Sequence, residues 1–185
     1  MKKNRTKQLV MCGIFAALIG IGAFIQIPIP VVPLTLQDLF VMLAGILLGA
    51  KFGALSAFVY IFIGLLGFPV FTHGGGITYV LQPTFGFMLG FIPGAYLTGM
   101  LTHKVPEPGF KRIFLACLAG IGVIYFFGTA YLYLLNRFYL GNSIAFWPMI
   151  LACDIRPLPG DIIKSVIAAK IGQQLLPLIR KPGKW

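Results

Sequence analysis

The feature that most constrains this chain is a succession of long apolar runs, of which "LVMCGIFAALIGIGAFI" is the first. Charged residues make up 10% of the 185 residues, and only four residues are acidic; an ordinary soluble domain has about 25% charged residues. A chain with so few charges cannot cover a water-facing surface, so lipid must be its solvent. The sequence therefore predicts an all-α integral membrane protein.

Breaks between the apolar runs divide the chain into six predicted spans within one domain, residues 1–185. The proline-rich stretch "PIPVVP" closes the first run, and Lys51 stands at a tight junction between the second and third. A span needs about 20 apolar residues, so we expect neighbouring protein to cover the ends of the short second and third spans. The expected fold is a six-transmembrane-helix bundle with spans at about 9–27, 35–50, 52–68, 84–101, 113–135 and 159–178.

The basic residues predict the orientation of this bundle. With the N-terminus inside, the external segments hold only Arg137 and Arg156. The cytoplasmic segments hold eleven of the fifteen lysines and arginines: Lys2, Lys3, Arg5, Lys7, Lys51, Lys104, Lys111, Arg112, Arg180, Lys181 and Lys184. This bias follows the positive-inside rule, so we expect both termini in the cytoplasm.

Several classes of function are excluded by what the sequence lacks. The basic residues flank apolar runs instead of forming a face interleaved with aromatics, which argues against nucleic-acid binding. The cysteines Cys12, Cys117 and Cys153 lie far apart without metal-ligand spacing, so we expect buried apolar side chains and no metal site. There is no GxxxxGK[ST], HExxH or GxSxG motif, which argues against nucleotide hydrolysis and against catalytic residues. We expect a non-catalytic protein without a cofactor.

The strongest candidate for a polar site lies in "PLPGDIIKSVIAAK", where Asp161 and Lys164 open the last apolar run. Prolines suit a helix start, and a carboxylate in the first turn is favoured by the helix dipole, whereas a lysine there is not. Residues three apart share one helix face. One interpretation is a structural ion pair; the other, favoured because ionisable residues inside spans are functional candidates, is a contact for a solute that enters from outside. Lys170 points to another face, where it could snorkel to the cytoplasm or bind a partner.

A second polar group precedes the second span, in "LTLQDLF". Thr35 and Asp38 have the spacing of a capping box, in which each side chain binds backbone donors at a helix start. Gln37 could face the bundle and offer its amide to a ligand, or be solvated at the end of the loop.

The loop "HGGGITY", residues 73–79, carries three consecutive glycines, Gly74, Gly75 and Gly76. Glycines allow tight backbone turns, so the loop could be a connector. It could also be a lid, in which the glycines approach a bound solute closely and Phe71 and Tyr79 supply apolar walls.

Small residues recur at helical spacing in the first span. Gly13 with Ala17, and Ala16 with Gly20, form small-xxx-small pairs, which let another helix approach closely. The pairs predict either internal packing or an interface with a partner protein.

Three stretches, taken in order, resemble one known family: "IPIPVVPLTLQDLFVMLAGILLGAKFG", "PTFGFMLGFIPGAYLTG" and "PLPGDIIKSVIAA". They are similar to the biotin-specific substrate-binding (S) components of energy-coupling factor (ECF) transporters, the BioY family. The resemblance covers nearly the whole chain except residues 104–153.

The resemblance implies a multi-pass protein of a prokaryotic plasma membrane that captures biotin from outside with high affinity. It implies partners as well: a membrane-embedded T component and two cytoplasmic ATPase subunits. Asp161 and Lys164 match the PGDxxK motif that contacts the ligand in the family, and the glycine-rich loop matches its lid. The first helix, around Ala16 and Gly20, matches the T-component interface.

Some alternatives stay open at this stage. The resemblance does not decide which of Asp161 and Lys164 meets the ureido ring of biotin and which meets its carboxylate. An S component for a different vitamin, or a membrane scaffold without a solute, is the alternative function. The sequence also does not distinguish a chain that works alone from a homo-oligomer.

Overall fold

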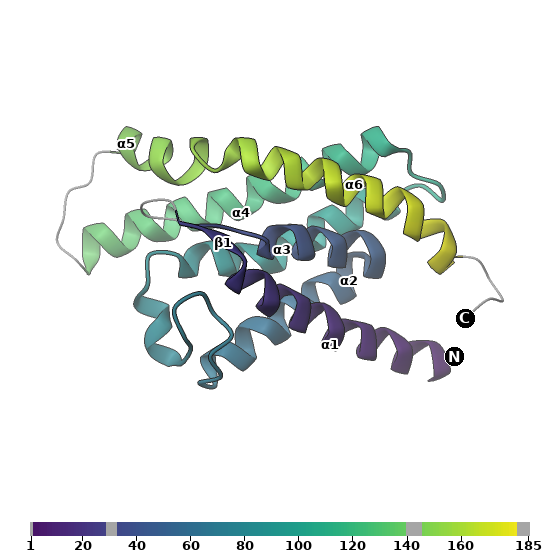
Figure 1. The fold of residues 1–185 in the computed structure, drawn as a ribbon, viewed down its shortest axis with the longest axis horizontal. Coiled ribbons are helices and arrows are strands. Elements are labelled where there is room, and N and C mark those ends of the chain that lie inside the picture. The colour runs from purple at the N-terminus through teal and green to yellow at the C-terminus, as the bar shows by residue number, and fades with distance from the viewer. Residues whose placement is uncertain (1, 29–32, 140–145, 181–185) are drawn as a thin grey trace.

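The computed structural model describes residues 2–28, 33–139 and 146–180. It is an elongated bundle in which the start of the first helix and the end of the last lie at the same end (Figure 1). The long helices are α1 (Lys2–Phe24), α2 (Gln37–Leu65), α3 (Phe85–His103), α4 (Phe110–Phe138) and α6 (Leu158–Arg180). Short elements are β1 (Gln26–Ile27), β2 (Leu34–Thr35), the 3-10 helix η1 (Ile77–Leu81), α5 (Phe146–Ile150) and the π-helix η2 (Leu151–Ile155).

Helix α2 is broken at Gly49, where φ is 81° and ψ is 179°. A positive φ favours glycine because a Cβ would clash with the backbone. The chain turns back on itself here, so closely that a Cβ added to Gly53 would lie 2.7 Å from the Cα of Gly45. The predicted junction between the second and third spans thus falls at Gly49, two residues before Lys51.

Five helices within the described ranges are long and apolar enough to cross a membrane, with α2 taken as one. The prediction of a mostly helical membrane protein is therefore confirmed. The first predicted span extends too far, because α1 ends at Phe24 and the next residues form a strand. There Gln26 pairs with Thr35 and Ile27 with Leu34, antiparallel. This pairing fixes the position of Thr35 just before α2.

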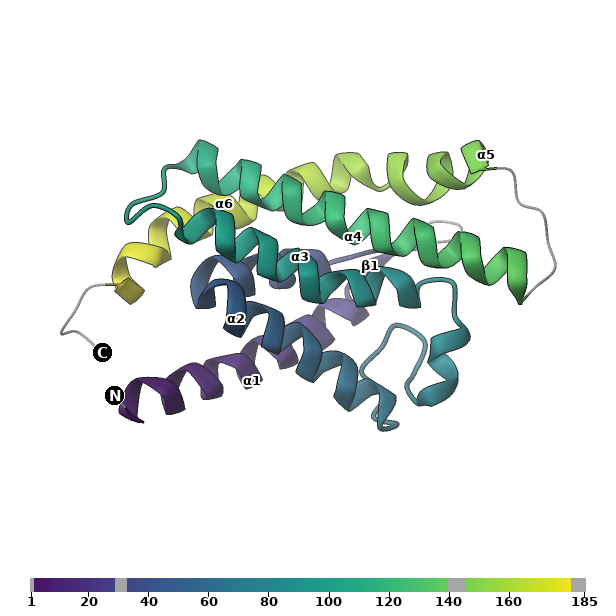
Figure 2. The ribbon, with the colours of Figure 1, turned by 180° about the vertical axis from the view of Figure 1, so that it is seen from behind.

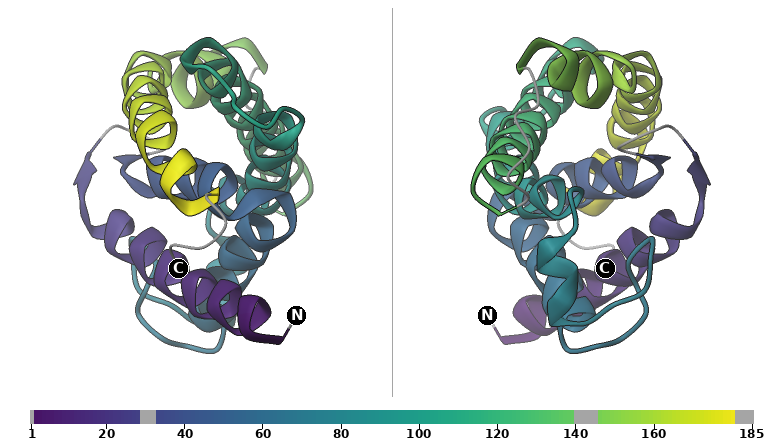
Figure 3. Two further views of the ribbon diagram at one scale, coloured as in Figure 1. Left: turned by 90° about the vertical axis from the view of Figure 1, so that its right-hand side faces the viewer. Right: turned by 90° about the vertical axis from the view of Figure 1, so that its left-hand side faces the viewer.

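The bundle is layered around α2. Figure 3, which looks along the long axis, shows α6 and α4 on the side opposite α1, with α2 between them. Seen from behind in Figure 2, α3 runs between α2 and α4. One buried cluster joins α1, α2, α4 and α6 around residues such as Met42, Ile46 and Ile113.

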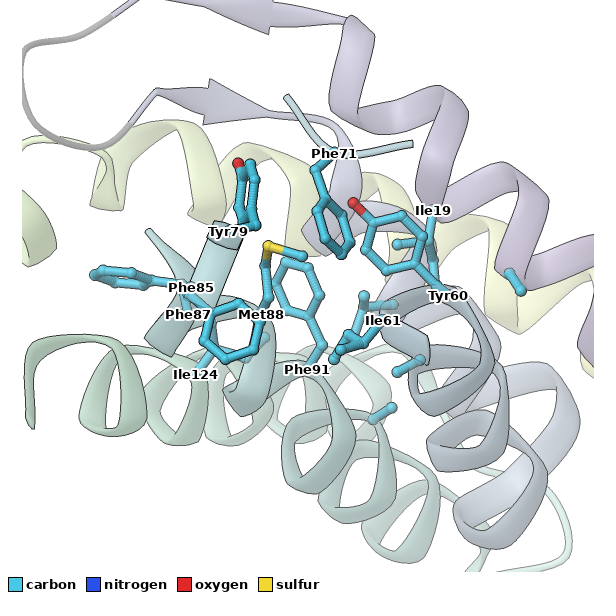
Figure 4. Packing of buried hydrophobic residues seen from close by; sticks show 14 of the residues in the cluster. Ile19, Tyr60, Ile61, Phe71, Tyr79, Phe85, Phe87, Met88, Phe91 and Ile124 are labelled. Atoms are coloured by element: carbon cyan, nitrogen blue, oxygen red, sulfur yellow. The ribbon is translucent and has the colours of Figure 1, made fainter. Parts of the chain in front are cut away.

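A second buried cluster is rich in aromatic side chains. Figure 4 shows its centre, where Tyr60, Phe71, Tyr79, Met88 and Phe91 come together from α2, the segment between α2 and α3, and α3 itself. Phe71 is fully buried, with its ring 4.5 Å from that of Tyr79 between centroids. The candidate site lies beside this cluster.

Candidate ligand-binding site

Asp161 and Lys164 lie in the first two turns of α6 and face the interior of the bundle. Asp161 is 2% exposed and Lys164 5% exposed. The Nζ atom of Lys164 lies 2.5 Å from Oδ1 of Asp161. Burying a charge is costly unless it is paired and hydrogen-bonded. The i, i+3 spacing provides this pairing, because it places the two side chains beside each other on one helix.

Lys164 also reaches across to the start of α2. Its Nζ donates to Oδ2 of Asp38 at 2.7 Å and to the backbone oxygen of Thr35 at 2.8 Å. Two carboxylates and one carbonyl therefore surround the ammonium group, which has hydrogen bonds to Asp38 and Thr35 and an ion pair with Asp161. The three residues Asp38, Asp161 and Lys164 are called the charged cluster below; its formal charge is −1.

The predicted capping box at Thr35 and Asp38 is wrong. The residue before α2 is Leu36, and no side chain caps the helix from that position. Asp38 points instead to Lys164, because a buried cation draws a carboxylate more strongly than a backbone amide does. Thr35 Oγ1 still accepts a bond from the backbone nitrogen of Gln37, at 3.4 Å.

The second oxygen of Asp161 is held by α4. The hydroxyl of Tyr125 donates to Oδ2 of Asp161, and Ser165 Oγ donates to the backbone oxygen of Asp161 at 2.7 Å. The orientation of the carboxylate is thus set by Tyr125 of α4 and by Lys164 of its own helix.

A pocket opens beside this carboxylate. Its lining combines the segment before α2, the segment between α2 and α3, α3, α4 and the start of α6: Pro33, Leu34, Thr35, Gln37, Asp38, Thr72, Tyr79, Thr84, Phe87, Met88, Phe91, Ile124, Tyr125, Cys153, Pro157 and Asp161. Most of these side chains are apolar or aromatic, and the lining also includes the carboxylates of Asp38 and Asp161. Such a wall suits a small ligand with one polar end and one apolar end.

Gln37 faces the bundle, as one of the two interpretations of its position predicted. It is buried and lines the pocket. Its Nε2 donates to the hydroxyl of Tyr60 at 2.7 Å, and its Oε1 accepts from Thr35 Oγ1 at 3.2 Å. An amide has two N–H donors, so Gln37 can keep its bond to Tyr60 and still offer a donor to a ligand.

The glycine-rich loop folds back onto the end of α2. Gly74 and Gly76 have φ angles of 108° and 105°, and Gly76 N donates to the backbone oxygen of Gly64 at 2.7 Å. Gly75 approaches the backbone oxygen of Phe68 too closely for a Cβ to fit. None of the three glycines is among the pocket-lining residues, so the glycines shape the loop and Tyr79 reaches the pocket.

The structure thus brings three of the predicted ligand-binding residues to the pocket, namely Gln37, Tyr79 and Asp161. Lys164 lies behind Asp161, and Phe71 lies behind Tyr79 in the aromatic cluster. Their roles toward a ligand would be indirect in this arrangement.

The small residues of α1 fall on two faces. Ala16 and Gly20 are buried, and a Cβ on Gly20 would lie 3.6 Å from the ring of Tyr60. Internal packing accounts for this pair. Gly13 and Ala17 are exposed, with open space around Gly13, so only this second pair offers a surface to another helix.

Sequence reasoning missed several polar residues near the pocket. Tyr125 stands in the aromatic run "VIYFFG", where nothing distinguishes its hydroxyl from a membrane-interface tyrosine. Asp154 lies in η2 and both its carboxylate oxygens lie 2.8 Å from Thr129 Oγ1. The signal available in the sequence was the scarcity of acidic residues, because in a chain with so few carboxylates each one is expected to have a structural or functional role.

No group of three or more potential metal ligands gathers in the part of the chain that the structure describes. The cysteines are buried and separate. The side chains that line the pocket offer hydrogen bonds, apolar contacts and, from Asp38 and Asp161, carboxylate groups.

Comparison with known proteins identifies the family. The model of the BioY family matches residues 1–181. A probable biotin transporter BioY of Lysinibacillus sphaericus is 42% identical over 97% of this chain and 92% of its own length. The biotin transporter BioY of Thermotoga maritima is 38% identical over 91% and 95%. Among solved structures, the S-component for biotin from an ECF-type ABC transporter superposes with a TM-score of 0.83 at 27% identity, over 95% of this chain and 93% of that one. With a match along nearly its whole length, this chain belongs to the BioY family.

Proposed function

We propose that this protein binds biotin and serves as the S component of an ATP-driven ECF transporter, without catalysis of its own. The observation that carries the proposal is the buried carboxylate of Asp161, fixed by Lys164 and Tyr125 at the polar end of a pocket with aromatic walls. The names of the relatives, biotin transporters and a biotin S-component, support the same ligand.

The charge of the cluster indicates how biotin lies in the pocket. Two carboxylates face one ammonium group, so the cluster has spare hydrogen-bond acceptors and an excess negative charge. The ureido ring of biotin carries two N–H donors and no charge, which suits Asp161. A ligand carboxylate in the same place would add a second unpaired negative charge in a poorly solvated site, which is costly. We therefore assign the ureido ring to Asp161 and place the carboxylate of biotin away from the cluster.

The remaining walls suit the rest of biotin. Its fused sulphur ring and four-carbon chain are apolar, and Phe87, Met88 and Phe91 of α3 with Tyr79 line the pocket. Contacts of sulphur with aromatic rings are favourable. In this proposal Lys164 is the counter-ion that holds Asp161 in place, and it has no direct contact with biotin.

We infer six spans with both termini in the cytoplasm of a prokaryotic cell, in the plasma membrane. The break at Gly49 supports this, because it lets the first half of α2 act as one predicted span and the second half as another. In the sequence, Lys51 follows the α2 break, and Lys104, Lys111 and Arg112 flank the α3–α4 connection. That connection lies at the same end of the bundle as the start of α1 (Figure 1). The basic Lys181 and Lys184 lie outside the described residues.

Transport against a gradient needs an energy source. We propose that a T component in the membrane couples this chain to two cytoplasmic ATPase subunits. The exposed pair Gly13 and Ala17 on α1 is the surface that supports close helix contact; the buried pair Ala16 and Gly20 does not contribute to it.

The proposal is tested by equilibrium binding to the purified protein, with biotin, thiamine and riboflavin compared. We expect biotin to bind and the other two vitamins not to compete. Asp161→Asn should weaken biotin binding by about 1–3 kcal/mol, the cost of a mismatched buried polar group. Asp154→Asn is the matched control, since its carboxylate binds Thr129 and does not line the pocket. No biotin binding by the wild type would refute the function; equal affinity in wild type and Asp161→Asn would refute the site.

A further inference from the structure

The segment between α2 and α3, residues 66–84, forms one wall of the pocket. It contributes Thr72, Tyr79 and Thr84 to the lining. Its regular structure is limited to the bridge between Phe71 and Gly74 and to η1. Its backbone bonds are otherwise short-range turns, apart from the bond of Gly76 N to the backbone oxygen of Gly64 in α2. The position of such a segment depends largely on contacts with its surroundings. This stretch is called the wall segment below.

Two tyrosine hydroxyls hold the wall segment by its backbone, one near each end. Tyr60 of α2 donates to the backbone oxygen of Val70 at 3.2 Å. Tyr131 of α4 donates to the backbone oxygen of Val80. The two bonds come from different helices, so together they restrain the segment at two separate backbone positions.

Aromatic contacts position both rings for these bonds. The ring of Tyr60 meets that of Phe71 edge-on, 5.5 Å between centroids at 78°, as Figure 4 shows. The ring of Tyr131 meets that of Phe85 at 5.9 Å and 66°. Both geometries are the preferred T-shaped arrangement. The rings would stay in place if the hydroxyls alone were removed.

Tyr60 is connected to the pocket as well. It accepts from Gln37, Gln37 accepts from Thr35, and the backbone oxygen of Thr35 accepts from Lys164. A continuous series of hydrogen bonds therefore runs from the charged cluster to the wall segment. Such bonds are strengthened by their neighbours in a poorly solvated interior.

We propose that Tyr60 and Tyr131 are positioning residues that hold the wall segment closed over bound biotin and thereby set its rate of dissociation. This rests on the proposed function. In this proposal biotin leaves the pocket past the wall segment, and both carbonyl bonds break when the segment moves aside. Neither hydroxyl touches the ligand in this account, since neither tyrosine lines the pocket.

The effect should appear in dissociation and hardly in association. A lost hydrogen bond of this kind changes an equilibrium by about three- to tenfold, so Tyr60→Phe and Tyr131→Phe should each raise the dissociation rate constant by about that factor. Tyr60→Phe should be the larger, because it also leaves Gln37 Nε2 without its acceptor. If the segment moves as one body, the double variant should show the product of the two factors.

The experiment measures the dissociation of labelled biotin from the purified full-length protein after addition of excess unlabelled biotin. Tyr96→Phe is the matched control, because Tyr96 lies exposed on α3, outside the pocket lining. Faster dissociation in both variants, with an unchanged association rate and an unchanged control, supports the proposal. Unchanged dissociation overturns the proposal. This holds even if the variants unfold at a lower temperature, because a general loss of stability would lower the fraction of protein that binds biotin and not the dissociation rate of the folded protein.

Hydrogen–deuterium exchange without ligand provides a second arm. The amides of Phe71 and Gly76 bond to Gly74 and Gly64 within and beside the wall segment. They should exchange severalfold faster in both phenylalanine variants, while α3 amides stay unchanged. Equal exchange in wild type and variants overturns the proposal even if biotin binding is absent, which separates its failure from that of the proposed function.

Discussion

At the pocket end of the bundle, charged and hydroxyl side chains reach from helix to helix, whereas at the bend of α2 the backbones themselves are in contact. In the first region Lys164 of α6 binds residues on both sides of the start of α2, and Tyr125 of α4 binds Asp161. In the second region a Cβ on Gly45 would lie 2.5 Å from the backbone oxygen of Ala95, and one on Gly99 would lie 2.5 Å from the nitrogen of Ala50.

The difference shows which features serve binding and which serve the scaffold. Small residues allow close backbone packing, which drives helix association in lipid, and they offer nothing to a solute. Buried charges contribute little net stability, so their presence at the pocket is better explained by a ligand. We call the contact of Gly45, Gly53 and Gly99 the glycine seam.

The largest effect is expected for Lys164→Met, which leaves the carboxylates of Asp38 and Asp161 buried without a cation. Removing one partner of a buried ion pair costs about 3–5 kcal/mol. Thermal unfolding in lipid nanodiscs should show this loss, and biotin binding should be abolished. Lys170→Met makes the same exchange six residues later on the exposed face of α6 and should change stability little. Similar unfolding temperatures for the two variants would contradict the role of the charged cluster.

Next in size is Gly45→Ala in the glycine seam. The added methyl group must displace the backbone of α3 at Ala95 and Gly99, and overpacking of this kind costs about 1–3 kcal/mol. Gly122→Ala is the control, because nothing lies within 4 Å of the added Cβ; it should be neutral or slightly stabilising, as alanine favours helix. Unfolding temperature is again the readout, and biotin affinity measured below it should stay at the wild-type value in both. Weakened affinity in folded Gly45→Ala would show that the two regions are coupled.

A smaller effect is expected for Asp38→Asn. Lys164 keeps Asp161 and the backbone oxygen of Thr35 as acceptors, and the cluster becomes neutral, so we expect a loss of about 1 kcal/mol, as for one hydrogen bond. The measurement is the same unfolding experiment. The loss of stability in Asp38→Asn is compared with that in Lys164→Met. Loss of the cation should cost several times more than loss of one anion, because the cation is the partner of both carboxylates. Equal costs would mean that Asp38 and Lys164 act as an isolated pair.

The sequence predicted the parts of this arrangement that local patterns control. The i, i+3 spacing of Asp161 and Lys164 placed them on one face of a helix, and the short runs around "GAKFG" predicted a tight junction, which lies at Gly49. The mostly helical membrane fold followed from the apolar runs and is confirmed.

Contacts between distant segments could not be predicted in this way. Asp38 and Lys164 are 126 residues apart, and the local capping pattern around Asp38 pointed to a different partner. Tyr125 and Tyr131 belong to an aromatic run whose hydroxyls have no periodic signal. Ala16 and Gly20 fit an interface pattern equally well whether the neighbouring helix belongs to the same chain or to another, and only the packing against Tyr60 decides.

The smallest effect is expected at the bend itself, for His103→Ala. His103 lies in the last turn of α3, and its Nε2 lies 2.8 Å from the backbone oxygen of Ile46, just before the break in α2. Because the glycine seam holds this end through its backbones, a hydrogen bond from a partly exposed side chain should contribute only about 0.5 kcal/mol. His103→Gln, which keeps a donor, serves as the control in the same unfolding experiment. A loss larger than that of Gly45→Ala, restored by glutamine, would show that a side chain holds the bend, and the contrast between the two ends of the bundle would then be wrong.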